Sequence, residues 1–218
     1  AAREADKITQ MEARTRAFGP RKRVYLECTA SIEEGRIWQE YENGSHARIA
    51  VQCPSCAQWV TPERDHFSGF EEASNKIDAG VNAMFFCPAC GVGWTSEERI
   101  EANANSMLIH EGEEIGDDGI TGDRKKTDTL GFRWSAVNNC LVPNDELSYE
   151  ELLGRECWEA KNAEDEDNAE KEQCQFVWAV PYVPKKFDMI PLSRNGVTRR
   201  TKLLKRGASP ENKIWLTV

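Results

Sequence analysis

The 218-residue sequence lacks long hydrophobic runs, a phosphate-binding loop and the serine nucleophile motif GxSxG. No stretch approaches the roughly 18 consecutive apolar residues of a membrane span, and the first residues lack the apolar run of a signal peptide. We therefore expect a soluble, intracellular protein with no membrane partner. The missing GxxxxGK[ST] loop argues against a complete nucleotide site, and because the sequence opens on Ala rather than Met we expect a piece of a longer protein.

The formal charge of -9 is unevenly distributed along the sequence. Residues 111–172 carry 19 acidic against 7 basic side chains, whereas residues 185–213 carry 9 basic against 2 acidic ones. The net acidic charge argues against a uniform nucleic-acid-binding surface. The basic tail is nevertheless a local candidate for one.

Hydrophobic periodicity predicts a mixed α/β fold. Helical patterns cover residues 8–18 and 31–41, and an alternating strand pattern covers residues 22–28 between them. A strand whose last residues lead into a helix is typical of α/β proteins.

Short strands and two marked helix starts follow. The expected strands are residues 47–51, 58–61, 83–86, 93–94 and 130–136. Capping boxes at Thr95 and Ser148 predict helices after them, the first of which should end near Met107. Residues 111–128 are rich in Gly and Asp without periodicity, which indicates a solvated loop, and Pro181 marks the start of an extended linker.

Two matched Cys-Pro-x-Cys turns, each between two predicted short strands, contain Cys53, Cys56, Cys87 and Cys90. One such turn supplies two thiolates, and zinc takes four soft ligands in a tetrahedron, so two turns complete its coordination. We therefore predict a zinc-ribbon-like module with one zinc ion. Its role should be structural, because four thiolates leave no open coordination position for catalysis.

Two disulfides or four ordinary buried thiols are the alternatives for these cysteines. An intracellular chain with two such similar turns favours zinc. The 30 residues between the turns exceed the ~15 to 20 of a usual ribbon, which predicts an insertion between Thr61 and Asn82. Thioredoxin-like redox catalysis is not expected, since it uses a single Cys-x-x-Cys turn on a βαβ unit.

The other cysteines and the histidines carry weaker signals. Four further cysteines fall in or near predicted elements and are expected to be buried as small hydrophobic residues: Cys28, Cys140, Cys157 and Cys174. The histidines are expected at the surface or at helix ends rather than as metal ligands: His46, His66 and His110.

A series of short segments runs nearly from end to end of the sequence. They are residues 13–18 (ARTRAF), 26–31 (LECTAS), 35–38 (GRIW), 51–56 (VQCPSC), 87–91 (CPACG), 130–132 (LGF), 181–182 (PY), 205–207 (KRG), 210–211 (PE) and 214–218 (IWLTV). Their order and spacing resemble the central part of the large terminase subunit of lambda-type tailed phages and prophages, the GpA family.

Proteins of this family are DNA-packaging motors with an N-terminal P-loop ATPase and a C-terminal metal-dependent nuclease of RNase H-like fold. The resemblance implies that this chain lies between the Walker B motif and the first metal-binding Asp of the nuclease. A full-length family enzyme would use ATP and Mg, whereas this segment would contain no catalytic residue of its own.

The resemblance also implies a domain organisation. Residues 1–46 would end the P-loop ATPase sheet, residues 47–110 would form the zinc-ribbon-like module, residues 111–184 an acidic loop, strand and long helical linker, and residues 185–218 a basic linker with the first nuclease strand. The implied partners are double-stranded DNA, the small terminase subunit, the portal and further copies of the same chain. The implied location is the cytoplasm of the bacterial host.

One family motif matches in altered form. The segment after the Walker B strand usually reads Ser-Thr-Pro-Thr or similar and is thought to couple nucleotide state to DNA movement. Here the matching residues are 28–31, so the resemblance makes Thr29 and Ser31 candidate coupling residues, with Cys in place of the first Ser and Ala in place of the Pro. The alternative is that both hydroxyls cap a helix that begins near Ile32.

The basic tail is a candidate DNA-binding region, because it is basic and precedes the implied nuclease strand. The candidate residues are Lys185, Lys186, Arg194, Arg199, Arg200, Lys202, Lys205 and Arg206. Two other functions remain open. One is a free-standing zinc-ribbon adaptor that binds nucleic acid or protein without catalysis, and the weaker one is a zinc-dependent hydrolase.

Overall fold

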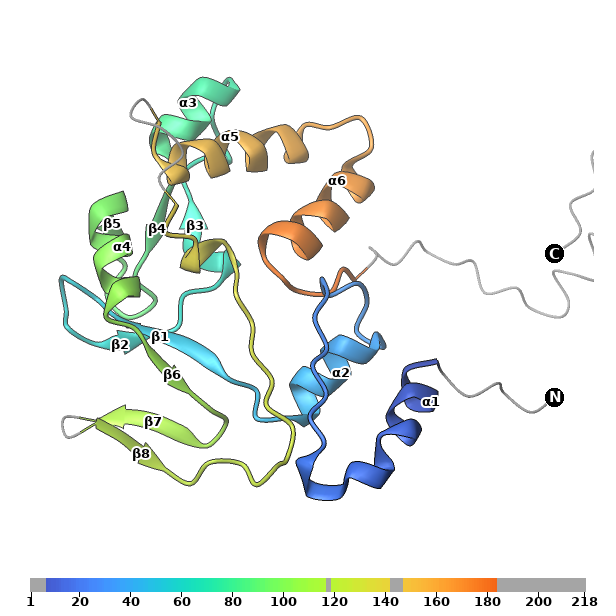
Figure 1. Ribbon diagram of the computed structural model, residues 1–218. Coiled ribbons are helices and arrows are strands. Elements are labelled where there is room, and N and C mark those ends of the chain that lie inside the picture. Colours follow the sequence, from blue (N-terminus) through green and yellow to red (C-terminus); the bar gives the residue numbers. More distant parts are fainter. Residues whose placement is uncertain (1–6, 117–118, 142–146, 184–218) are drawn as a thin grey trace, which may run out of the picture. The chain divides into compact units, whose positions relative to one another are not determined.

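The computed structural model describes residues 7–116, 119–141 and 147–183 (Figure 1). The strands are β1 (Arg48–Gln52), β2 (Trp59–Val60), β3 (Phe67–Ser68), β4 (Met84–Phe86), β5 (Gly93–Trp94), β6 (Met107–Ile109), β7 (Glu113–Gly116) and β8 (Gly119–Gly122). They form three small antiparallel sheets in the orders β2-β1-β6, β3-β4-β5 and β7-β8. Together with the helices these sheets confirm the mixed α/β class.

The helices are short and connect or cover the sheets. The α-helices are α1 (Lys7–Arg14), α2 (Arg36–Asn43), α3 (Lys76–Asn82), α4 (Ser96–Ala104), α5 (Tyr149–Lys161) and α6 (Glu166–Glu172). The tighter turns η1 (Arg16–Arg21), η2 (Arg64–His66) and η3 (Ala136–Asn138) are 3-10 helices, and η4 (Gln173–Val177) is a π-helix. No helix within the described residues is long and apolar enough to cross a membrane.

One hydrophobic core joins the first two sheets to α5 and to the end of η4. Its larger members include Val51, Phe67, Phe85, Trp94, Leu153 and Trp178. The Trp178 ring lies 5.9 Å from the Phe67 ring and 6.4 Å from the Phe85 ring, measured between centroids. The chain that follows α6 is therefore anchored on the central strand β4.

Helices α3 and α5 approach closely because small residues lie where they meet. A Cβ added at Gly154 would lie 2.4 Å from the Ala83 Cβ and 2.8 Å from the Ala79 carbonyl oxygen. Any larger residue at this position of α5 would therefore push the two helices apart.

A buried ion pair connects α4 to α5. Arg99 is fully buried and its Nε donates to Glu150 Oε1 at 2.5 Å. The Arg99 Nη1 also donates to the carbonyl oxygens of Val137 at 3.0 Å and Asn139 at 2.6 Å. A charge taken out of water needs such partners, so this cluster fixes the chain around η3 against both helices.

Most elements that were predicted from short-range sequence signals are present in the structure. Capping boxes form at Thr95 and Ser148, and they open α4 and α5 as predicted. The four expected strands around the cysteine turns are present as β1, β2, β4 and β5. The helix expected to end near Met107 ends at Ala104 instead, and Met107 begins strand β6.

The strand expected at residues 22–28 is absent, and this part of the prediction was wrong. Residues 22–32 form no regular element, and the helix expected from residue 31 begins at Arg36. The apolar side chains of Val24, Tyr25 and Leu26 are exposed. A strand needs a neighbour to pair with, and none of the described strands lies beside this segment.

Two predictions for the acidic region were also wrong. The expected loop at residues 111–128 contains the β7–β8 hairpin, in which Ile115 pairs with Ile120. The strand expected at residues 130–136 is an extended segment tied at isolated points, where the Ala47 N–H donates to the Gly131 carbonyl at 2.9 Å and Ser45 Oγ accepts from the Gly131 N–H at 3.2 Å. Isolated hydrogen bonds of this kind do not form the regular pairing of a β-sheet.

Candidate metal centre

The first cysteine turn connects β1 to β2. The Cys53 N–H donates to the Gln58 carbonyl, and the Cys53 carbonyl accepts from the Ala57 N–H, both at 2.9 Å. Ala57 has a φ of 58°, the left-handed conformation that lets the chain turn back into β2. The turn therefore presents both of its thiols on one side.

The second turn, between β4 and β5, repeats this geometry residue for residue. The Cys87 N–H donates to the Val92 carbonyl, and the Cys87 carbonyl accepts from the Gly91 N–H, both at 2.9 Å. Gly91 has a φ of 73° and occupies the place of Ala57. The turns belong to different sheets, so the structure builds the cluster from two similar and separate hairpins.

The four thiols meet in one cluster. Their sulfur atoms all lie within 4.8 Å of one another. The Sγ–Sγ distances are 3.9 Å for Cys53 with Cys90 and 3.9 Å for Cys56 with Cys87. A disulfide has its sulfurs about 2.05 Å apart, so these cysteines are not paired in disulfides.

The spacing of the sulfur atoms suits a tetrahedral metal. A Zn–S bond of about 2.3 Å places two ligands of a regular tetrahedron about 3.8 Å apart. Both of these distances approach this value, and each pair joins one hairpin to the other. The donor set of four thiols is also the one typical of structural zinc.

The protein shifts the pKa values of two thiols in the cluster in opposite directions. Burial tends to raise the pKa of Cys53, but the backbone N–H groups of Cys56 and Ser55 outweigh it and lower the pKa to about 6. Burial raises the pKa of Cys87 to about 12. Without a metal, the protein therefore favours ionisation of Cys53 and opposes ionisation of Cys87. A divalent cation would favour the ionised form of both thiols.

A buried tryptophan lies beside the cluster, and no sequence pattern predicted this position. Trp94 is 2% exposed, and among the described residues its Nε1 donates no hydrogen bond to a nitrogen or oxygen atom. Its indole also contributes to lowering the pKa of Cys53. An indole N–H without an oxygen partner suits a thiolate sulfur, as found around metal-bound cysteines.

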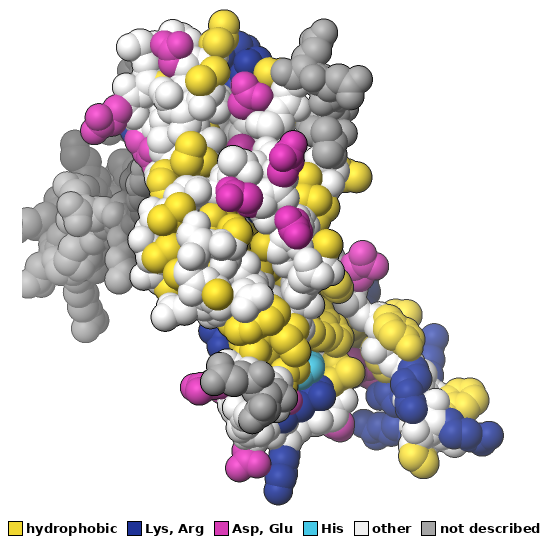
Figure 2. All heavy atoms as spheres, turned by 90° about the vertical axis from the view of Figure 1, so that its left-hand side faces the viewer, with side chains coloured by type: hydrophobic (Ala, Val, Ile, Leu, Met, Phe, Trp, Pro, Cys, Tyr) yellow, Lys and Arg dark blue, Asp and Glu magenta, His cyan; other side chains and the backbone are white. Residues whose placement is uncertain are grey.

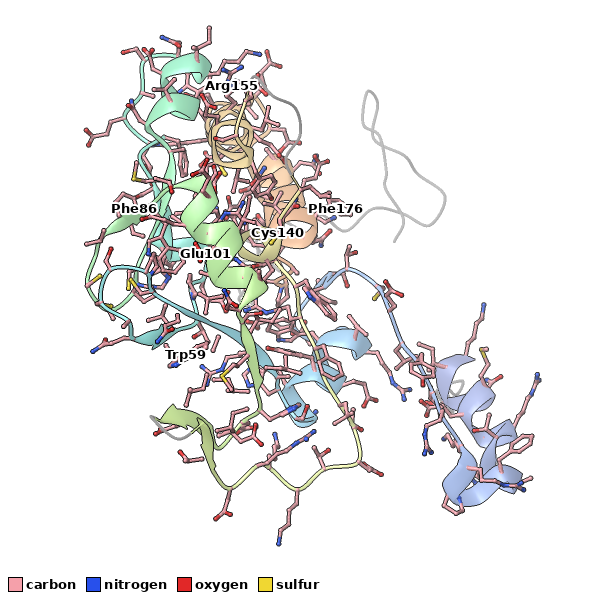
Figure 3. The ribbon with its side chains drawn as sticks, turned by 60° about the vertical axis from the view of Figure 1, so that its left-hand side comes forward. Trp59, Phe86, Glu101, Cys140, Arg155 and Phe176 are labelled. Carbon is pink, nitrogen blue, oxygen red and sulfur yellow. The ribbon has the colours of Figure 1, made fainter. Side chains whose placement is uncertain are left out.

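The cluster is part of the hydrophobic core rather than of an appendage. Cys53 is 1% and Cys87 is 2% exposed, and both pack in the core that contains Leu153 and Trp178. The labelled residues Trp59 and Phe86 in Figure 3 belong to strands β2 and β4, which lie beside the two turns. Cys90 is exposed, so the cluster has one thiol at the surface.

The insertion expected between the two cysteine turns is an integral part of the fold. It contains η2, β3 and α3, and β3 pairs with β4 through Phe67 and Phe85. The long spacing between the turns therefore adds a strand to the second sheet.

The remaining cysteines divide into two pairs. Cys157 and Cys174 are buried as predicted, and burial raises the pKa of Cys157 to about 12. Cys28 and Cys140 are exposed, so the prediction was wrong for them. Cys28 is the last residue of the absent strand, and Cys140 (Figure 3) lies just after η3, where no element covers it.

The histidines lie apart from the sulfur cluster. His66 closes a capping box, because its Nδ1 accepts from the Glu63 N–H at 3.1 Å. His46 stacks edge-on against Tyr41, with 4.6 Å between ring centroids. His110 is 8% exposed, so the expectation of a surface residue was wrong there.

Thr29 and Ser31 lie in the irregular segment that precedes α2. Both are exposed. The N-cap of α2 is Gly35 and no side chain caps it, so the alternative that these hydroxyls cap a helix near Ile32 was wrong. A coupling role for them stays a prediction. The predicted DNA-binding residues, from Lys185 to Arg206, lie outside the described residues, as does the expected nuclease strand.

The fold and the cluster define an α/β protein built around a four-cysteine centre that could hold a metal. Residues 1–108 match the family described as phage terminase large subunit gpA, ATPase domain. This part of the chain belongs to that family, which confirms the resemblance over residues 1–108. The match spans all four cysteines of the cluster. No curated protein and no solved structure gave a significant match to the chain.

Proposed function

We propose that this chain is the segment of a phage packaging terminase that links the ATPase centre to the nuclease. The observation that carries the proposal is the family match over residues 1–108, which runs through both cysteine turns. The full-length enzyme would move DNA with ATP and Mg and cut it. This segment would contribute structure and coupling rather than catalytic residues.

In this proposal the four cysteines bind a structural zinc ion. The sulfur spacing, the matched turns and the orphan Trp94 N–H support that assignment. Zinc would connect two sheets whose shortest strands, β2, β3 and β5, have two residues each and would be marginal alone. The ion would therefore keep the segment rigid while force passes through it.

Thr29 and Ser31 would be the coupling residues. Their exposed side chains, which cap no helix, support the proposal because they are accessible to a nucleotide-bound neighbour. The exposed apolar side chains of Val24, Tyr25 and Leu26 fit a strand that pairs with the remaining ATPase sheet. Figure 2 shows other hydrophobic side chains gathered across the middle of one face, below a group of acidic ones.

The basic residues from Lys185 to Arg206 would contact DNA phosphates. The proposal rests on their charge and their position along the sequence. Deleting residues 185–206 from the full-length protein should weaken DNA binding and flatten its dependence on salt. An unchanged, salt-sensitive affinity after the deletion would remove this part of the proposal.

The free-standing zinc-ribbon adaptor has less support. The cysteine turns share one core with α5 and Trp178, so they do not form a separable module. A zinc-dependent hydrolase has less support still, because all four ligands would be thiolates.

The reading frame around this chain provides the test. The proposal expects Walker motifs upstream and an Asp-containing nuclease strand downstream. The extended protein should hydrolyse ATP and cleave DNA, and Thr29→Ala with Ser31→Ala should slow or uncouple ATP turnover. A frame without Walker motifs, or normal turnover and packaging in the double variant, would contradict the proposal or its coupling part respectively.

A further inference from the structure

The segment that contains Thr29 and Ser31 is hydrogen-bonded to distant parts of the described chain at one residue. Among residues 22–35, all of which the structure describes, only Ala30 is buried. Within the described part of the chain, two hydrogen bonds tie residues 23–34 to a distant element, and both end on the Ser31 carbonyl. The position of the whole segment therefore depends on the donors to that oxygen.

Both donors come from the last described part of the chain. Gln175 Nε2 donates to the Ser31 carbonyl at 2.9 Å, and the Tyr182 N–H donates to the same oxygen at 3.3 Å. Gln175 is 8% exposed, although its side chain is polar. Residues 144 positions apart in the sequence thus meet at one carbonyl.

The turn that carries Gln175 is firmly anchored. The Trp178 N–H donates to the Gln173 carbonyl at 3.1 Å, which closes the π-helical turn, and the Val180 N–H donates to the Cys174 carbonyl at 2.9 Å. Trp178 is 2% exposed and packs on the core, while its carbonyl accepts from Arg133 Nη1 at 3.2 Å. A single π-turn of this kind costs stability relative to an α-helix and often marks a functional position.

We propose that Gln175 is a positioning residue that couples the Thr29–Ser31 segment to the chain leaving the core at Tyr182. The inference rests on the proposed coupling role of Thr29 and Ser31. When the segment shifts, the shared carbonyl moves relative to two donors on either side of the fixed Trp178. Gln175 belongs to the rigid side and holds the shared carbonyl within reach of the Tyr182 N–H, so a shift of the segment reaches Tyr182 through that hydrogen bond only while Gln175 is in place.

The variants are Gln175→Met, which keeps the length of the side chain and removes its donor, and Gln175→Glu, which keeps its shape and also removes the donor. Phe176→Ala is the matched control, because Phe176 (Figure 3) belongs to the same turn and is 68% exposed. Thermal melting identifies any variant that has lost its fold. Loss of one hydrogen bond should speed amide exchange in residues 28–33 by roughly 3- to 10-fold in this chain, and the control should leave it unchanged.

The decisive measurement uses the full-length protein with and without a non-hydrolysable ATP analogue. We expect the analogue to change amide exchange at residues 28–33 and also at residues 178–183 in the wild type and in Phe176→Ala. In Gln175→Met the change at residues 28–33 should remain and that at residues 178–183 should fall at least threefold.

The outcomes separate the two proposals. If residues 28–33 do not respond to the analogue in the wild type, the proposed coupling function is wrong. If they respond but residues 178–183 do not, or if the response of residues 178–183 persists in Gln175→Met, the role of Gln175 is wrong and the coupling function stands.

Discussion

Replacing single cysteines separates the contribution of a bound metal from that of buried thiols. Cys87 is buried and Cys90 is exposed, and both belong to the same turn. Cys140 is exposed and lies outside the cluster, so Cys140→Ser is the matched control. If the cluster holds no metal, Cys90→Ser should be as harmless as the control, since an exposed substitution changes stability by less than about 0.5 kcal/mol.

The expected magnitude with zinc is much larger. Structural zinc contributes about 10–16 kcal/mol of apparent binding free energy at pH 7, comparable to the whole stability of a typical domain. Cys90→Ser should therefore cost at least ~3 kcal/mol, or about 6–12 °C in melting temperature for a chain of this length. Cys87→Ser should cost about 1–3 kcal/mol more, because it also leaves a buried hydroxyl without a partner.

Metal analysis and thermal melting test this expectation together. Wild type and Cys140→Ser should carry about one equivalent of zinc per chain and lose stability with a chelator, and the two ligand variants should carry less. Protein purified without chelator that holds under half an equivalent, or a Cys90→Ser variant that melts like Cys140→Ser, would refute the zinc assignment.

Three further substitutions, the last with a matched control, test the surrounding fold, each by urea unfolding. Gly154→Ala should destabilise by about 1–3 kcal/mol, because its Cβ has no room against α3; an unchanged midpoint would mean that the helices separate easily. Ala57→Gly should stabilise by about 0.5–1 kcal/mol, since φ is 58° there, and a loss would show that the turn is not strained. Glu150→Ala should cost about 3–5 kcal/mol by leaving Arg99 buried without its counter-ion, whereas Glu159→Ala, which removes an exposed ion pair, should cost under about 1 kcal/mol. Equal effects of the last two would contradict the burial argument.

The features that the sequence predicted well depend on near neighbours. A Cys-Pro-x-Cys turn between strands and a capping box at Thr95 are complete within a few residues, so their pattern is sufficient. The four-cysteine cluster itself required only the assumption that two similar turns meet. Its buried neighbour Trp94 follows the second turn by four residues, but nothing in its pattern distinguishes it from an ordinary core residue.

The features that the sequence missed depend on distant partners. The alternation at residues 22–28 is typical of a strand, yet no described strand pairs with it. The segment at residues 113–122 has little apolar pattern, and its hairpin is set by glycines, of which Gly119 has a φ of 114°. The contact between Gln175 and Ser31 spans most of the chain, and no local signal announces it.

The position of the cluster would link a bound metal to the proposed coupling segment. Each close sulfur pair joins a cysteine from the β1–β2 hairpin to one from the β4–β5 hairpin. Strand β1 continues from α2 and so from the segment with Ser31, while β4 supports Trp178 and with it the turn of Gln175. A metal that fixes the two hairpins would therefore also fix the acceptor and the donor of the Gln175–Ser31 hydrogen bond relative to each other. Without it, a shift of the coupling segment could be absorbed between the sheets instead of reaching Tyr182.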